Sequence, residues 1–182
     1  MTEAETAYCK NLQERDGLLR QFLGSRIFPD SNSRELCQYL SGIRLVLGNL
    51  SNSVSFAANL LAKQYLAERF DIGEFDAAAK PQGAPGPDIQ IRTGGGEVIL
   101  GELKTTLPYG VSDFGAAQKR EFQKDFDKLN ASNADFRFLF VTEERTFNLL
   151  KNKYASKIPG VRIVDLMNGN EHAAQQAAGA GR

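Results

Sequence analysis

The chain contains 182 residues, of which 42% are hydrophobic, and this is enough for one folded domain with a real core and a helical extension. Its 22 basic and 22 acidic residues leave a net charge of zero, which gives no support to a protein that binds nucleic acid over a broad basic surface. A local basic groove, balanced by acidic residues elsewhere, is compatible with this composition.

Cysteine and histidine are scarce, with only Cys9, Cys37 and His172 in the chain. The two cysteines fit no zinc-binding spacing, and chemistry that relies on histidine, such as Ser-His-Asp hydrolysis, has almost nothing to use. Any catalysis must therefore come from carboxylates, lysines and hydroxyls. Two thiols without a recognisable secretory leader predict a reducing cytoplasm. No apolar run approaches the ~20 residues that span a bilayer, which predicts a soluble protein without a membrane partner.

Helical patterning dominates residues 1–70. Apolar residues recur at helical spacing in "YCKNLQERDGLLRQFL" and in "VSFAANLLAKQYLAERF". Between them the "PDSNS" cluster interrupts the chain, and Ser33 is expected to cap a middle helix that ends near Gly48. We therefore predict a helical N-terminal region that packs on the core that follows.

Over residues 71–167 the pattern changes to α/β, with a mixed β-sheet flanked by helices. The expected strands are "EFDAAAK" as a weak candidate, "DIQIRT", "EVILGELKTT", "FRFLFV" and "VRIVDL". The expected helices are the amphipathic "DFGAAQKREFQKDFDKLN" and a segment from Glu143 to about Tyr154. Residues 168–182 are polar and rich in alanine, and we expect a disordered tail there.

One hairpin in this core gathers unusual charges. Asp88 begins the strand "DIQIRT", and Glu102 and Lys104 lie two apart on the next strand, so their side chains share one face. The "GGG" turn folds the two strands together and brings Asp88 near Glu102. Carboxylates are ligands that Mg²⁺ prefers, and an ammonium group can orient a water or neutralise charge that builds on phosphorus. These residue types favour a metal site for phosphodiester chemistry.

Pro87–Asp88 followed by Glu102–Leu103–Lys104 resembles the motif of the PD-(D/E)xK nuclease superfamily, which holds most type II restriction endonucleases. The order of elements over roughly residues 60–165 also resembles the core of that family. The triplet is the only acidic-x-lysine sequence in the chain. The resemblance implies a restriction-endonuclease-like core and an Mg²⁺-dependent endonuclease that cuts double-stranded DNA at a specific sequence and leaves a 5′-phosphate.

The resemblance also implies roles for individual residues. Asp88 and Glu102 would hold Mg²⁺ with the Leu103 carbonyl as a further ligand, and Lys104 would act on the attacking water. Cutting both strands of a palindromic target implies a symmetric homodimer.

Other positions are assigned on weaker grounds. Many members of the family add an acidic residue from the helix before the sheet; Glu68 is the best match by position, and Glu74 is the reserve. Gln118 and Lys119 begin the helix after the motif strand, and they are the expected DNA contacts.

Plainer interpretations remain open at this stage. The hairpin charges could form a cross-strand salt bridge of little value, although Leu100 shares the face of Glu102, so that face begins apolar. The helix lysines could lie on a solvated face between acidic residues; these lysines are Lys119, Lys124 and Lys128, and the acidic residues are Glu121, Asp125 and Asp127. A nuclease for repair, recombination or defence that recognises DNA structure, or a non-catalytic DNA-binding or assembly module, would also fit.

Overall fold

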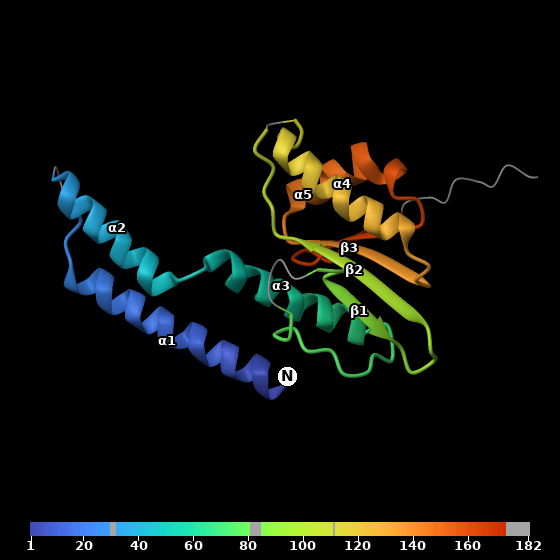
Figure 1. Cartoon of the computed structure of the whole chain (residues 1–182), viewed down its shortest axis with the longest axis horizontal. Helices are drawn as coiled ribbons and strands as arrows, with labels where there is room; N and C mark the ends of the chain where they lie inside the picture. The colour runs from blue at the N-terminus through green and yellow to red at the C-terminus, as the bar shows by residue number, and fades with distance from the viewer. Residues whose placement is uncertain (30–31, 81–84, 111, 174–182) are drawn as a thin grey trace, which may run out of the picture. The chain divides into compact units, whose positions relative to one another are not determined.

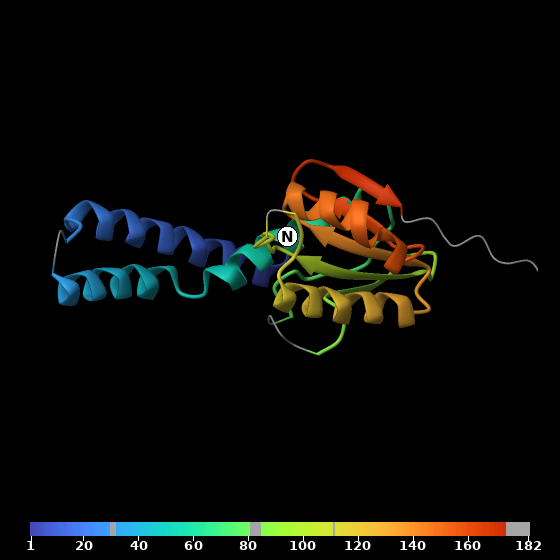
Figure 2. The ribbon, with the colours of Figure 1, turned by 90° about the horizontal axis from the view of Figure 1, so that it is seen from above.

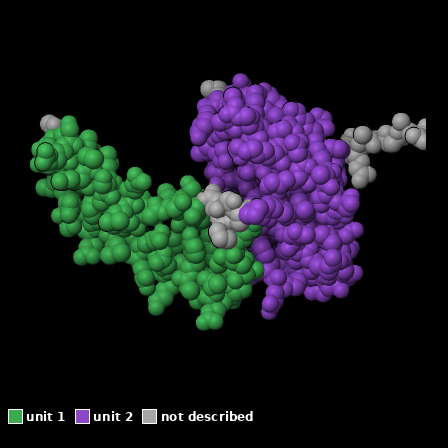
Figure 3. Space-filling model, in the orientation of Figure 1, with its two compact units in different colours: residues 1–56, 76–81 green, residues 57–75, 82–182 purple. Residues whose placement is uncertain are grey.

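The computed structural model describes residues 1–29, 32–80, 85–110 and 112–173, and the chain divides into two compact units (Figure 3). The first unit contains Met1–Phe56 with Asp76–Pro81, and the second contains Ala57–Phe75 with Gln82–Arg182. The boundary therefore falls inside a helix, whereas the sequence predicted a helical region that ends at residue 70.

The first unit is helical, as its apolar spacing predicts. It contains α1 (Glu3–Ser25), α2 (Ser33–Leu47) and the first turns of α3 (Leu50–Ala67). Asn32, rather than Ser33, caps α2, because its side chain accepts hydrogen bonds from two backbone N–H groups of the first turn. Gly48 ends α2 with a φ of 60°, a value that suits glycine.

Five strands form one mixed sheet in the second unit: β1 (Ile89–Arg92), β2 (Val98–Lys104), β3 (Phe136–Val141), β4 (Arg162–Asp165) and β5 (Asn170–Ala173). Their spatial order follows their order in sequence. The pairs at the two edges are antiparallel, and β2, β3 and β4 run parallel to one another. The general α/β class with a mixed sheet is therefore confirmed.

Helices cover both faces of this sheet (Figures 1 and 2). On one face lie α4 (Ala116–Ala131) and α5 (Glu144–Leu149), which continues as a π-helical turn (Leu150–Tyr154) and a short 3₁₀ turn (Ala155–Lys157). Phe122, Phe126 and Leu129 of α4 pack there with Leu139 and Ile163 of the strands. On the other face the part of α3 that belongs to this unit packs on the sheet through Ala58, Ala62, Tyr65 and Leu66. The sheet thus has an apolar layer on each face, and the charged side chains of β2 must lie within or beside one of these layers.

Two predicted segments differ from the structure. "EFDAAAK" forms no strand, and near it only Ile72 makes a single bridge, to Thr93. The expected disordered tail does not begin directly after Met167, because residues 170–173 pair with β4 as β5. The rest of that tail, residues 174–182, lies outside the described residues.

Within the described residues, the helical stretch Ser33–Ala67 is the one that is long and apolar enough to cross a membrane, with 22% of its most apolar window buried. Length and composition alone are weak evidence, because a core helix of a soluble protein passes the same test. The C-terminal part of α3 packs on the sheet through its buried residues. The expectations of a soluble protein and of a cytoplasmic location stay predictions.

Candidate functional site

The period of β2 sends its charged residues toward α4. Ile99 and Leu103 pack in the α3 layer, while Leu100 packs in the α4 layer. Glu102 and Lys104 follow Leu100 at intervals of two, so they continue the α4 face. Glu102 is only 1% exposed, which places its carboxyl inside the protein rather than on a solvated hairpin.

Asp88 is held at the same end of the hairpin. It directly precedes β1, and the pairing of Ile89 with Gly101 places it opposite Glu102. Its Oδ2 atom accepts a hydrogen bond of 2.9 Å from the Leu103 N–H. The carboxylate is therefore fixed to the backbone of the motif strand, and it lies near Glu102 as the hairpin geometry predicted.

Two side chains of α4 complete a cluster of charges over β2. Asp125 is 3% exposed, and its Oδ2 atom lies 2.7 Å from the Lys104 ammonium. Lys128, one turn further along α4, lies 3.2 Å from both carboxylate oxygens of Glu102 and 3.5 Å from Asp125 Oδ1. We name these five residues, Asp88, Glu102, Lys104, Asp125 and Lys128, the acid–lysine cluster.

Lys104 and Asp125 form an ion pair that lacks the geometry of a hydrogen bond. Lys104 lies close to Asp125 Oδ2, yet among the described residues this oxygen has no partner in hydrogen-bond geometry. We treat the contact as an ion pair, because attraction between charges depends on distance more than on angle. A buried carboxylate oxygen with spare acceptor capacity is a feature that a cation or an ordered water can satisfy.

The cluster is unbalanced in charge when all its groups are ionised, with three carboxylates against two ammonium groups. Burial raises the pKa of Glu102 to about 8, and the charges of Asp88 and Asp125 add to the rise. Burial lowers the pKa of Lys128, but the hydrogen bond to Glu102 and the charges of Glu102, Asp125 and Asp88 together outweigh it and leave that pKa raised. Lys128 in turn opposes the rise in the pKa of Glu102, because its ammonium favours the ionised carboxylate.

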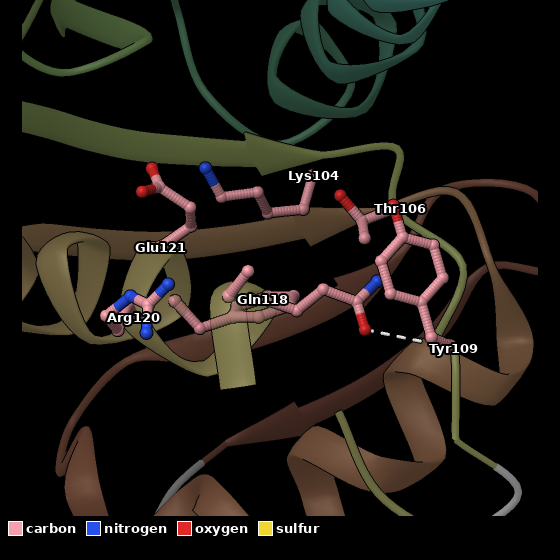
Figure 4. A pocket seen from close by; sticks show the side chains of 8 residues that line it. Lys104, Thr106, Tyr109, Gln118, Arg120 and Glu121 are labelled. Atoms are coloured by element: carbon pink, nitrogen blue, oxygen red, sulfur yellow. Dashed lines mark hydrogen bonds between the residues drawn. The ribbon is translucent and has the colours of Figure 1, made fainter. Parts of the chain in front are cut away.

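A pocket of about 340 Å³ opens beside Lys104, between β2, the following loop and α4 (Figure 4). The Lys104 ammonium and the Glu121 carboxylate lie on one side of it, and the Tyr109 ring lies on another. Arg120 adds a further cation to its lining. The pocket thus gives solvent and small groups a route to the Lys104 end of the cluster.

The expected DNA contacts, Gln118 and Lys119, both have partners within the protein. The Gln118 amide oxygen accepts hydrogen bonds from the N–H groups of Tyr109 and Gly115, and its Nε2 donates to the Leu107 carbonyl. Lys119 pairs with Asp113 at 2.7 Å. Gln118 therefore fixes the loop after β2, and of the two only Lys119, which is about half exposed, presents a charge to solvent.

Glu68 and Glu74 are not brought to the cluster by any contact that the structure shows among its described residues. Glu68 follows the end of α3 and forms an exposed ion pair of 3.3 Å with Arg69. Arg69 also pairs with Glu171 on β5, at the far edge of the sheet from β1. The acidic residue that a helix does contribute is Asp125, which follows β2 in sequence rather than preceding it.

Asp125 and Lys128 were missed as site residues because their helix was expected to expose its charges. A signal was nevertheless present: Gln118, Phe122, Asp125 and Leu129 follow one another at steps of four, three and four, and all are buried. An acidic residue on the buried stripe of a helix needs a partner inside the protein. That stripe faces β2, and Lys104 of the motif lies on the facing side of this strand, where it can pair with Asp125.

The cluster offers two carboxylates, Asp88 and Glu102, as ligands for a hard cation at one end of β2. Among the described residues, no group of three or more histidine, cysteine, aspartate or glutamate side chains is arranged to hold a metal ion. Mg²⁺ commonly needs just one or two carboxylates, because it keeps several of its waters. Asp88 and Glu102 supply two carboxylates at one end of β2, so the chemistry of the donors fits Mg²⁺ although Lys128 now contacts Glu102.

Comparisons with known proteins identify no family for this chain. No protein-family model matches the chain, and neither curated proteins nor solved structures give a match.

Proposed function

We propose that the chain is an Mg²⁺-dependent DNA endonuclease with a PD-(D/E)xK-type core. The observation that carries this proposal is the burial of Glu102 beside Asp88, with Lys104 two residues along the same strand. Burying a carboxyl next to further carboxylates costs free energy, and protein sites that accept this cost are often functional.

The residues of the cluster would divide the work as follows. Asp88 and Glu102 would hold the ion, with the Leu103 carbonyl as a further candidate ligand. When bound, Mg²⁺ would supply Lewis-acid stabilisation of the charge that develops on the phosphate. Asp125 holds the Lys104 ammonium in place, and from there Lys104 would orient the attacking water or neutralise that same charge.

The substrate in this proposal is double-stranded DNA, cut at a specific sequence as in a type II restriction enzyme and leaving a 5′-phosphate. Lys119 and Arg120 lie at the start of α4, near the pocket that adjoins Lys104, and they are candidate phosphate contacts. Because the net charge of the chain is zero, affinity would come from such a local group of cations and fall steeply with salt. A homodimer would cut both strands at a palindromic site.

Two rivals to this function remain. A nuclease that recognises DNA structure would use the same cluster, and the cleavage pattern distinguishes it. A non-catalytic DNA-binding or assembly module is favoured by one observation, since the cluster lysines both have carboxylate partners inside the protein. In that case the ion pairs of Glu102 and Lys104 would only stabilise the folded structure, and the protein would bind DNA without cutting it.

The test is digestion of supercoiled plasmid and genomic DNA with and without Mg²⁺. The wild type is compared with Glu102→Gln and Lys104→Met on β2, and with Lys124→Met and Asp127→Asn, which alter exposed side chains of α4. We expect discrete Mg²⁺-dependent bands from the wild type and both controls, and none from the two cluster variants. A smear that the cluster variants lose would favour the structure-recognising nuclease. DNA binding without cleavage by the folded wild type would reject the nuclease and leave the binding module.

A further inference from the structure

The contact between Lys128 and Glu102 has an asymmetry that bears on metal binding. Lys128 is 43% exposed in its side chain and reaches the cluster from the outer surface of α4, whereas Glu102 is 1% exposed. Of the two partners, only the lysine has room to leave. Its four-carbon stem can turn toward solvent without moving the backbone of α4.

Lys128 lies 3.2 Å from each of the two carboxylate oxygens of Glu102. The ammonium of Lys128 therefore occupies the position that a metal ion bound by the Glu102 carboxylate would take. Repulsion between the two positive charges prevents both from contacting the same oxygens at once. The other lysine of the cluster does not have this role, since Lys104 is paired with Asp125 rather than with Glu102.

We propose that Lys128 is a tethered counter-cation that occupies Glu102 in the metal-free protein and is displaced when a divalent cation binds. This inference rests on the metal site of the proposed function and adds a residue that sets its affinity. Lys128 stabilises the buried carboxylate until the ion arrives, and the ion must offset the loss of that ion pair. The site thus binds the ion more weakly than its carboxylates alone would.

The prediction concerns binding, so it can be tested without DNA cleavage. Titration calorimetry with Mn²⁺ and with Mg²⁺ compares the wild type with Lys128→Met, which removes the charge and keeps most of the length of the side chain. We expect the divalent cations to bind Lys128→Met at least about fivefold more tightly than the wild type, a typical coupling between two ligands of one group. Lys124→Met, four residues earlier on α4, removes a lysine whose partner is the exposed Glu121 and should leave the affinity unchanged.

Lys128→Met leaves Glu102 without its counter-charge, so thermal melts with and without Mn²⁺ accompany the titrations. At pH 8.5, where Glu102 is ionised, we expect a lower melting temperature than the wild type in chelator, and a larger rise on addition of Mn²⁺. Lys128→Arg keeps the positive charge, so it should bind the ions no more tightly than the wild type. This comparison tests the proposal even where Lys128→Met fails to fold.

Equal or weaker binding by Lys128→Met would overturn the proposal, as would tighter binding by Lys128→Arg. Absence of binding by both the wild type and Lys128→Met would overturn it as well. Failure of the nuclease alone has a different signature, in which Lys128→Met binds Mn²⁺ more tightly while neither protein cuts DNA.

Discussion

Lys104 of β2 and Asp125 of α4 lie 2.7 Å apart across the boundary between the sheet and its covering helix. The two residues are 21 positions apart in sequence, and the carboxylate is almost fully buried. An ammonium held by a buried carboxylate loses most of its rotational freedom, which suits a group that must meet a substrate in one orientation. The motif lysine is therefore positioned by a residue that lies outside the motif.

Asp125→Asn should lower cleavage by about 10- to 100-fold, because a shift of about 1 Å in a catalytic group can cost that much. The asparagine keeps the volume of Asp125 but removes the charge that fixes Lys104. Steady-state kinetics should show the loss in kcat with little change in KM, which a general weakening of the fold would not produce.

The matched control for this change is Asp127→Asn, since Asp127 is exposed on the same helix and accepts a hydrogen bond from Gln123 alone among the contacts shown. It should leave kcat within about twofold of the wild type, the range expected for surface changes. Wild-type kcat in Asp125→Asn would show that Lys104 needs no help from α4.

The pKa of Glu102 predicts how stability depends on pH in the metal-free protein. Burial raises this pKa from 4.5 in the unfolded chain to about 8 in the folded one. The folded state therefore binds more protons between these values, and the free energy of unfolding should fall as pH rises from about 5 to about 8, by a few kcal/mol at most. Urea denaturation in chelator at pH 5.5, 7 and 8.5 measures this fall.

Glu102→Gln removes the titrating group and should flatten this dependence. Mg²⁺ should stabilise the wild type more at pH 8.5 than at pH 5.5, because protons compete with the ion for the carboxylate. Stability that stays constant or increases over this range in the wild type would contradict the assigned pKa.

The hairpin could be predicted from sequence because all its information is local. Period-two alternation on either side of three glycines specifies two antiparallel strands and the face that Glu102 and Lys104 share. Asp88 follows from the same register. The acid–lysine cluster could be predicted as far as these three residues for that reason.

The contributions of α4 could not be predicted with the same ease, because they depend on how the helix packs on the sheet. Rotating the helix by one residue would move Asp125 by about 100° around its axis and separate it from Lys104. The packing of Phe122, Phe126 and Leu129 fixes that rotation. The position of Glu68 likewise depends on the direction in which α3 crosses the sheet.

The strand β5 shows a second limit. Asn170–Ala173 has no apolar alternation, and its side chains are mostly exposed. It pairs with β4 through backbone hydrogen bonds at the edge of the sheet, and such pairing leaves little trace in side-chain pattern.

Leu129→Ala tests whether the packing of α4 holds the cluster. Leu129 is fully buried, so its truncation should lower the free energy of unfolding by about 2–5 kcal/mol. Leu107→Ala, at a position 56% exposed, should change it by less than about 0.5 kcal/mol. Urea denaturation measures both. Similar costs for the two variants would mean that α4 does not pack as described.

The loop between β2 and α4 is held by Asp113, which provides a last test. Its carboxylate pairs with Lys119 and accepts a hydrogen bond of 2.7 Å from the Tyr154 hydroxyl, and these contacts hold the pKa of Asp113 well below its usual range. A lowered pKa stabilises the fold above the unfolded value near 4, and this stabilisation is lost as the pH falls further.

Tyr154→Phe removes the hydroxyl and should lower the melting temperature at pH 7. The difference from the wild type should be as large at pH 3 as at pH 7, because the lowered pKa keeps Asp113 ionised in the folded protein at both values. Tyr109→Phe, at a ring 84% exposed, should melt as the wild type does at both values. A Tyr154→Phe deficit that persists in an Asp113→Asn background would assign the effect to ring packing instead. Because the same loop lines the pocket beside Lys104, Tyr154→Phe should also raise the KM for DNA if that pocket receives substrate.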